Sequence, residues 1–131
     1  MKKTIALLLV TMSLLPTCKK DHEAAAPAIT LQAKWTLDNT VVKEYLNGTL
    51  VYNTTMPGNG TFVDFQSNGN LVVTVGTTVQ SSPYVLLPGS KVQFEGSIYE
   101  IRSLTVSGVV LYTRDDYAPN EYDETFISLK K

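Results

Sequence analysis

The side chains best suited to chemistry are few and lie near the N-terminus. Cys18 is the only cysteine and His22 is the only histidine in the 131-residue chain. A lone cysteine cannot form an internal disulfide, and a free thiol is a liability in an oxidising compartment. Attachment of acyl chains would remove that liability, so the residues around Cys18 decide which chemistry this sulfur performs.

The segment before Cys18 has the pattern of an export signal. Met1-Lys2-Lys3 is a short positive region, and residues 4–15 are almost wholly apolar. This run is shorter than the roughly 20 apolar residues that cross a bilayer, and its length is typical of a signal peptide. The junction Leu15-Pro16-Thr17-Cys18 resembles the lipobox of bacterial lipoproteins. The resemblance implies cleavage before Cys18 and acylation of its thiol and then its amine, which would hold the chain stably on a membrane.

This interpretation divides the chain into three parts. Residues 1–17 are the expected signal peptide, residues 18–32 the expected lipidated, flexible tether, and residues 33–131 the expected domain. We therefore expect a lipid-anchored protein of the bacterial cell envelope, at the outer membrane and facing either the periplasm or the surface. The alternative is an ordinary cleaved signal, but no Ala-x-Ala-like junction is present. The charged run 19–23 resembles the export signal of surface-displayed lipoproteins in some Gram-negative bacteria. The alternative is a solvated spacer.

Catalytic and metal-binding patterns are weak. His22 falls in the expected tether, so it cannot complete a Ser-His-Asp arrangement with the domain. Oxygen ligands for Ca²⁺ gather after Tyr112, but without EF-hand spacing, and we expect a solvated loop there. The net charge of −1, with no basic patch, argues against nucleic acid. We expect no catalytic residue, metal or cofactor, and no enzyme activity. The acidic residues concerned are Asp115, Asp116, Glu121, Asp123 and Glu124.

The segments after residue 33 are predicted to be β-strands. Short β-branched and aromatic runs alternate with Gly, Pro and Asn, and no long window has a helical period. About nine short strands at near-regular spacing predict an all-β, antiparallel up-and-down barrel of 8–9 strands. Pro83, after two serines, is expected to break the chain between strands.

The first hairpin can be predicted in detail. Asn47-Gly48 favours a type I′ turn, because both central residues of that turn need positive φ. A two-residue loop pairs Tyr45 with Leu50, Lys43 with Tyr52, and Val41 with Thr54, and it places Tyr45 and Tyr52 on one face. We expect alanine at Gly48 to cost more than alanine at Gly58 in the following loop. Further hairpin turns are predicted at 67–70 and 88–90.

Four segments together resemble the short lipocalin-like domains of bacterial lipoproteins. They are Lys34-Trp35-Thr36-Leu37, Phe65-x-x-Asn68-Gly69-Asn70-Leu71, Tyr99-Glu100-Ile101-x-x-Leu104 and Val110-Leu111-Tyr112. The resemblance implies an antiparallel barrel, in many members of unknown role. It also implies that the Trp35 ring closes one end of the barrel under an arginine, for which Arg102 and Arg114 are the candidates.

An eight-stranded barrel is just wide enough to be filled by its own side chains or to hold one small ligand. The candidates for lining the core or a ligand site are Trp35, Phe62, Phe65, Tyr84, Phe94, Tyr99 and Tyr112. In a domain of this size a filled barrel is favoured over a hollow one. We expect a non-enzymatic protein that binds a small apolar ligand or an envelope protein. The alternatives are a structural or assembly accessory of an envelope complex and an inhibitor or immunity-type protein.

Overall fold

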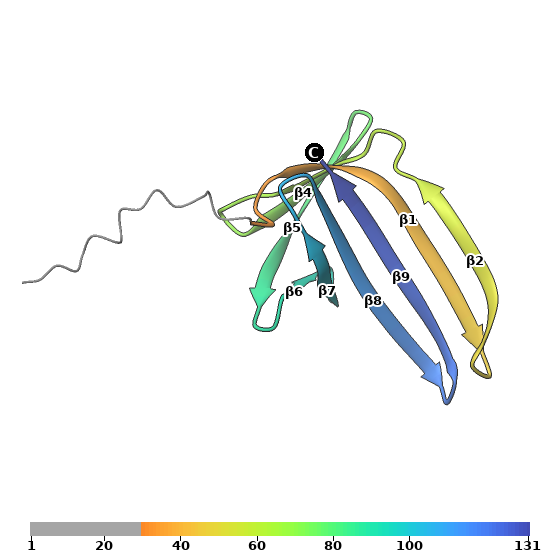
Figure 1. Cartoon of the computed structure of the whole chain (residues 1–131). Coiled ribbons are helices and arrows are strands. Elements are labelled where there is room, and N and C mark those ends of the chain that lie inside the picture. The colour runs from red at the N-terminus through yellow and green to blue at the C-terminus, as the bar shows by residue number, and fades with distance from the viewer. Residues whose placement is uncertain (1–29) are drawn as a thin grey trace, which may run out of the picture.

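The computed structural model describes residues 30–131, which form an all-β fold (Figure 1). Eight of the nine strands close into an antiparallel barrel, and one strand lies outside it. The predicted fold class is thus confirmed. The strands are β1 (Lys34–Leu46), β2 (Thr49–Pro57), β3 (Phe62–Phe65), β4 (Asn70–Val75), β5 (Thr78–Leu87), β6 (Lys91–Phe94), β7 (Ser97–Leu104), β8 (Gly108–Ala118) and β9 (Glu121–Lys130).

The first strand organises the whole fold because it pairs with three others. One edge of β1 pairs with β3 over residues 34–36 and then with β2 over residues 39–46. The other edge pairs with β9, from Thr36–Lys130 to Tyr45–Tyr122, and this closes the barrel. β1 can serve both partners on one edge because it is 13 residues long.

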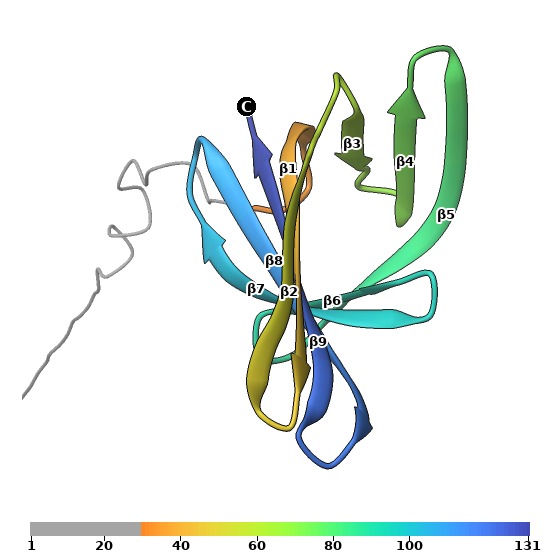
Figure 2. The same cartoon turned by 90° about the vertical axis from the view of Figure 1, so that its right-hand side faces the viewer.

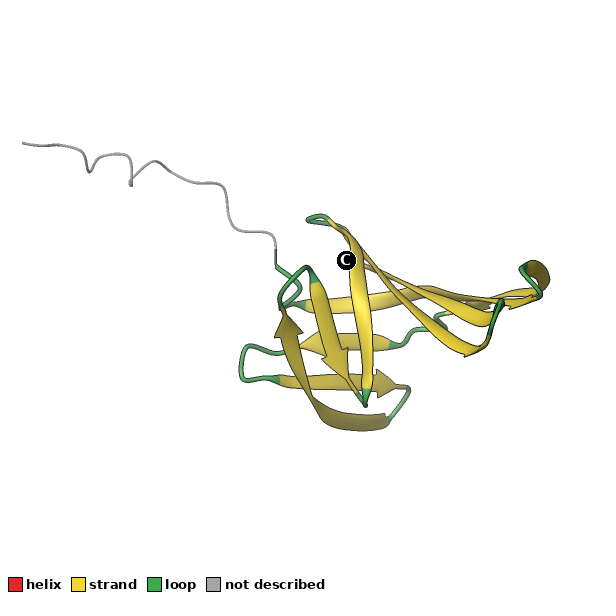
Figure 3. Cartoon of the chain, turned by 90° about the horizontal axis from the view of Figure 1, so that it is seen from below, coloured by secondary structure: helices red, strands yellow, loops and turns green. Residues whose placement is uncertain are grey.

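The long strands continue past the barrel as a separate sheet. We call this sheet the wing, formed by residues 41–46, 49–57, 113–118 and 121–126 in the spatial order β2-β1-β9-β8. Figure 3 shows it projecting from the closed part of the molecule. At its tip the Gly48 N–H donates to the Asn120 carbonyl at 2.9 Å, which ties the β1–β2 turn to the β8–β9 turn.

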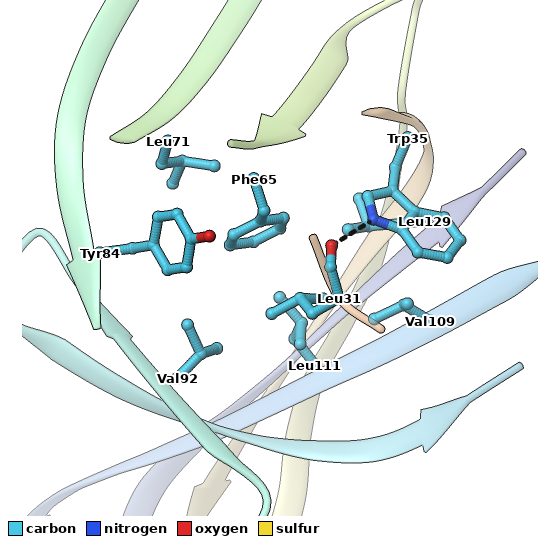
Figure 4. Close-up of a cluster of buried hydrophobic side chains, with 9 residues drawn as sticks. All are labelled: Leu31, Trp35, Phe65, Leu71, Tyr84, Val92, Val109, Leu111 and Leu129. Carbon is cyan, nitrogen blue, oxygen red and sulfur yellow. Dashed lines mark hydrogen bonds between the residues drawn. The ribbon is translucent and has the colours of Figure 1, made fainter. Parts of the chain in front are cut away.

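The core fills the barrel and begins earlier than expected. Leu31 is only 3% exposed, and its carbonyl accepts a 2.9 Å hydrogen bond from Trp35 Nε1 (Figure 4). The folded part therefore starts at least two residues before Ala33, and residue 31 does not belong to the tether. A leucine flanked by Thr30 and Gln32 has no periodicity that could have revealed its burial. The buried cluster is Leu31, Trp35, Phe65, Leu71, Tyr84, Val92, Val109, Leu111 and Leu129.

The first hairpin confirms part of its prediction. Asn47 and Gly48 have φ values of 54° and 77°, as a type I′ turn requires, and Tyr45 pairs with Leu50. The two pairs beyond it were wrong. Tyr52 lies opposite Glu44, because a β-bulge between Glu44 and Tyr45 in the ladder shifts the register by one residue. Such a shift moves Tyr52 to the face opposite Tyr45.

Two other sequence predictions are corrected. Pro83 does not break the chain but lies inside β5, where that strand changes partner from β4 to β6. The expected acidic loop is mostly strand, since β8 runs to Ala118 and β9 starts at Glu121. The hairpins predicted at 67–70 and 88–90 are present.

The loop between β2 and β3 closes against β1 where that strand changes partners. The Gly58 N–H donates to the Asp38 carbonyl at 2.9 Å, and the Leu37 N–H donates to the Thr61 carbonyl at 2.8 Å. Gly58 is buried, and a β-carbon there would lie 1.8 Å from the Leu37 carbonyl oxygen. Only glycine fits between the two backbones, a constraint that the sequence alone does not reveal.

The expected signal peptide, Cys18, His22 and most of the expected tether lie outside the described residues. Within residues 30–131, no helix has the length and apolar character needed to cross a membrane.

Candidate functional site

An apolar cavity of about 160 Å³, partly open to solvent, lies on the inner side of the barrel. Four of its lining residues are fully buried, namely Phe65, Leu71, Leu111 and Leu129. The other lining residues are half-buried: Leu37, Thr40, Thr61, Val63, Val73, Phe94 and Ile127. The only polar atoms that the lining side chains contribute are two threonine hydroxyls, and none of these side chains can ionise. The barrel is thus neither completely filled nor widely hollow.

The cavity exists because alternate residues of each strand point inward. In β4, Leu71 and Val73 face the cavity, while Val72 between them faces outward, as the two-residue period of a strand requires. In β1, Leu37 and Thr40 both line it although they are three residues apart. The irregular pairing with β9 between Leu37 and Asn39 provides the extra residue that brings Thr40 back to the inner face.

Five of the seven predicted lining residues belong to the barrel interior. Trp35, Phe65 and Tyr84 are buried, and Phe94 and Tyr99 pack against them. The Phe65 ring meets Tyr84 and Phe94 edge to face, at 5.2 and 6.0 Å between centroids. Phe94 also stacks on Tyr99 at 4.5 Å. Of these five, only Phe65 and Phe94 contact the cavity, so the others act mainly in packing.

The other two predicted lining residues point away from the cavity. Phe62 is 39% exposed and lies beneath the Lys34 ammonium group. Its distance of three residues from Phe65 places it on the opposite face, as the strand period predicts. Tyr112 is 7% exposed but packs on Phe126 outside the barrel. Its burial comes from neighbours on the outer face, which a sequence pattern does not specify.

The tryptophan has a different cationic neighbour from the expected one. Lys131 Nζ lies 4.6 Å from the centroid of the Trp35 ring. Arg102 and Arg114 instead cover Tyr112 and Tyr122, each with its Cζ 3.6 Å from the ring centroid. The expectation of an arginine over Trp35 was therefore wrong, because both arginines point to the outer face of the sheet.

The outer face of the wing carries a set of aromatic rings that sequence analysis did not identify. Tyr45 stacks on Tyr122 at 4.6 Å, and Phe126 lies beneath Lys43. These rings come from β1 and β9, which are far apart in sequence, so only the closure of the barrel brings them together. The cations already cover the rings, and a cation over an aromatic face contributes about 0.5–1 kcal/mol at exposed sites.

The acidic residues of β8 and β9 are dispersed, and three of the five have a partner. Arg114 pairs with Asp116 at 2.8 Å, and the Tyr117 hydroxyl donates to Asp123 at 2.8 Å. The Tyr112 hydroxyl donates weakly to Glu124 at 3.5 Å. Within residues 30–131, no three His, Cys, Asp or Glu side chains gather closely enough to hold a metal ion.

Two titratable groups near the core and the barrel rim are perturbed. Burial, followed by the negative charge of Glu95, raises the pKa of the Tyr99 phenol. The hydrogen bond from Lys130 and the charge of that ammonium lower the pKa of Asp38. Neither side chain lines the cavity. The cavity therefore has no group placed to move a proton, and what it offers a small molecule is apolar contact.

The fold and the cavity define a small antiparallel barrel protein with an apolar internal site. Comparisons of the chain with protein-family models, with curated proteins and with solved structures give no match. The resemblance to lipocalin-like domains of lipoproteins therefore stays a prediction.

Proposed function

We propose that this protein is a non-enzymatic binding module that holds one small, neutral, apolar molecule inside its barrel. The observation that carries the proposal is the cavity of about 160 Å³, whose lining side chains offer two hydroxyls and no charge. An apolar cavity of roughly 150 Å³ is large enough to admit a benzene-sized molecule. The ligand is neutral because burying an unpaired carboxylate or ammonium among such side chains is strongly unfavourable.

The test uses probes of matched size and different charge. Benzene and 1-hexanol should shift the NMR signals of the lining methyl groups of Val63, Val73 and Ile127, and sodium hexanoate should shift them much less. At a free ligand concentration of ten times Kd, binding should stabilise the fold by about 1.4 kcal/mol. The absence of any shift with millimolar benzene and hexanol would disprove the proposed ligand class.

A pair of valines in one strand gives a matched control. Val73→Phe places a ring into the cavity and should abolish the response to benzene. Val72→Phe makes the same chemical change one residue earlier on the outward face and should leave the response intact. Equal loss in both variants would mean that the response does not come from the cavity.

We also propose that Cys18 carries acyl chains which hold this module at the bacterial cell envelope. The support is the sequence Leu15-Pro16-Thr17-Cys18 after a short apolar run, together with the lack of any other cysteine. The two proposals are independent, since the cavity is formed entirely by residues 37–129.

A further inference from the structure

The free edge of the wing indicates a second kind of interaction, separate from ligand binding. Within residues 30–131, β2 pairs only with β1, so its other edge is open. In Figure 2, β2 lies in front of its neighbours with that edge uncovered. Soluble proteins usually protect such an edge with charges, since unpaired backbone groups recruit another strand. The nine residues of β2, Thr-Leu-Val-Tyr-Asn-Thr-Thr-Met-Pro, contain no charged side chain.

We propose that β2 pairs antiparallel with β2 of a second copy of this chain, on a twofold axis through Thr54. This register places Thr54 opposite Thr54 of the second copy and Tyr52 opposite its Met56, twice by symmetry. Tyr52 is 50% exposed and Met56 is 47% exposed, and both lie on the inner face of the wing with Thr54. Threonine pairs and sulfur–aromatic contacts are favourable across neighbouring strands.

The irregular ends of β2 fit the same register. Pro57 has no N–H to donate, and it would lie opposite Val51, which is the extra residue of the β-bulge and is itself outside regular pairing. The regular segment 52–56 is then paired along its whole length. Because the partner strand runs antiparallel, the two barrels would lie toward opposite ends of the joined sheet.

Charge does not oppose this contact. Glu44 is the charged residue nearest to the axis on the inner face, paired with Tyr52 across β1 and β2. The two Glu44 side chains would be separated by three strand spacings, about 14 Å, across the sheet and by four residues, about 13 Å, along it. That distance exceeds the screening length of about 10 Å in 0.1 M salt.

A charge exchange at the paired positions tests the proposal. Two differently tagged full-length copies are co-expressed and extracted in detergent, and recovery of one tag with the other is measured. Wild-type copies should co-purify. Tyr52→Lys/Met56→Lys should not bind itself, and neither should Tyr52→Glu/Met56→Glu, with at least a tenfold loss of recovery. Mixing the lysine variant with the glutamate variant should restore recovery, because each introduced lysine then faces an introduced glutamate of the other copy.

The control places the same charges elsewhere. Val79→Lys/Val85→Lys changes two exposed valines of β5, at 61% and 53% exposure, and should co-purify like wild type. Failure of wild-type copies to co-purify, persistence of the lysine variant's self-association, or failure of the mixed pair to recover would each overturn the proposal. The mixed pair also separates lost pairing from lost folding, since a misfolded variant would not be rescued.

A second measurement reports the register directly. Thr54→Cys places two thiols across the axis, and mild oxidation should give a disulfide-linked dimer on a non-reducing gel. Val79→Cys is the control, since both variants and the wild type contain the native Cys18. This control should give no more disulfide-linked dimer than wild type. Absence of the Thr54→Cys dimer alongside positive co-purification would overturn this register.

Discussion

Gly58→Ala should be the most damaging of the glycine-to-alanine substitutions in the β1–β3 region. The new β-carbon would lie 1.8 Å from the Leu37 carbonyl oxygen and 2.5 Å from its carbon. Both contacts are with backbone, so no flexible side chain can move aside. β1 and the loop would have to separate by more than roughly 1 Å. This reverses the sequence-based expectation, in which Gly58 is the more tolerant position.

Two backbone hydrogen bonds determine how much folding stability Gly58→Ala should cost. Separation of the two backbones would break the Gly58–Asp38 hydrogen bond of 2.9 Å and strain the Leu37–Thr61 hydrogen bond of 2.8 Å. A buried polar group left without its partner costs about 1–3 kcal/mol, so the broken hydrogen bond alone gives a loss of that size and the strained one adds to it. Gly48→Ala meets nothing within 4 Å and has only its φ of +77° to accommodate. That conformation costs a non-glycine residue about 1–2 kcal/mol.

Urea unfolding followed by fluorescence measures the difference. Trp35 is the only tryptophan and is 1% exposed, so unfolding changes its surroundings completely. Gly60→Ala is the matched control, because it lies in the same loop, has φ +77° and meets nothing within 4 Å. Gly58→Ala should lose at least 1 kcal/mol more than Gly60→Ala, on the order of one hydrogen bond. Equal losses in the two variants would refute the close approach of the loop to β1.

Three further outcomes are expected. Leu31→Ala should destabilise the fold by about 2–4 kcal/mol in the same urea assay, since it removes a side chain that is only 3% exposed; a change below about 0.5 kcal/mol, the usual range for a surface site, would return residue 31 to the tether. Stability should fall as the pH rises above about 10, because burial raises the pKa of Tyr99 and the unfolded chain loses its phenolic proton first; Tyr99→Phe should make this fall smaller, and an unchanged profile would contradict the assignment. Cys18→Ala should move the protein from the membrane fraction to the soluble fraction, and retention through high salt and carbonate would rule out the lipid anchor.

The sequence was informative where a local rule dictates the structure. Asn47-Gly48 specified its turn because few residues tolerate two successive positive φ values. The strand period could have placed Phe62 on the face opposite Phe65, but both residues were predicted to line the core or a ligand site. The position of β2 outside the barrel was not predictable, because it depends on β1 being long enough to pair with two strands along one edge.

Features that depend on long-range contact were missed for the same reason. The burial of Leu31 and of Gly58 depends on segments that meet only in the folded state. Tyr112 shows the limit for the candidate site, since its aromatic character predicted burial correctly but not the side of the sheet. The cavity itself depends on the irregularity near Asp38, and no residue type there signals it.

The pairing of the first strand with the last one has a consequence for how the chain acquires its structure. β1 meets β9 across about two-thirds of the sequence, so the barrel cannot close until residues 121–130 are available. Contacts between such distant segments slow folding to milliseconds or seconds in small β-proteins. A chain still emerging from a ribosome or an export channel can form the β1–β2 hairpin but not the barrel. Completion of the fold therefore has to wait until residues 121–130 have emerged, an order of events that fits the export we propose for this chain.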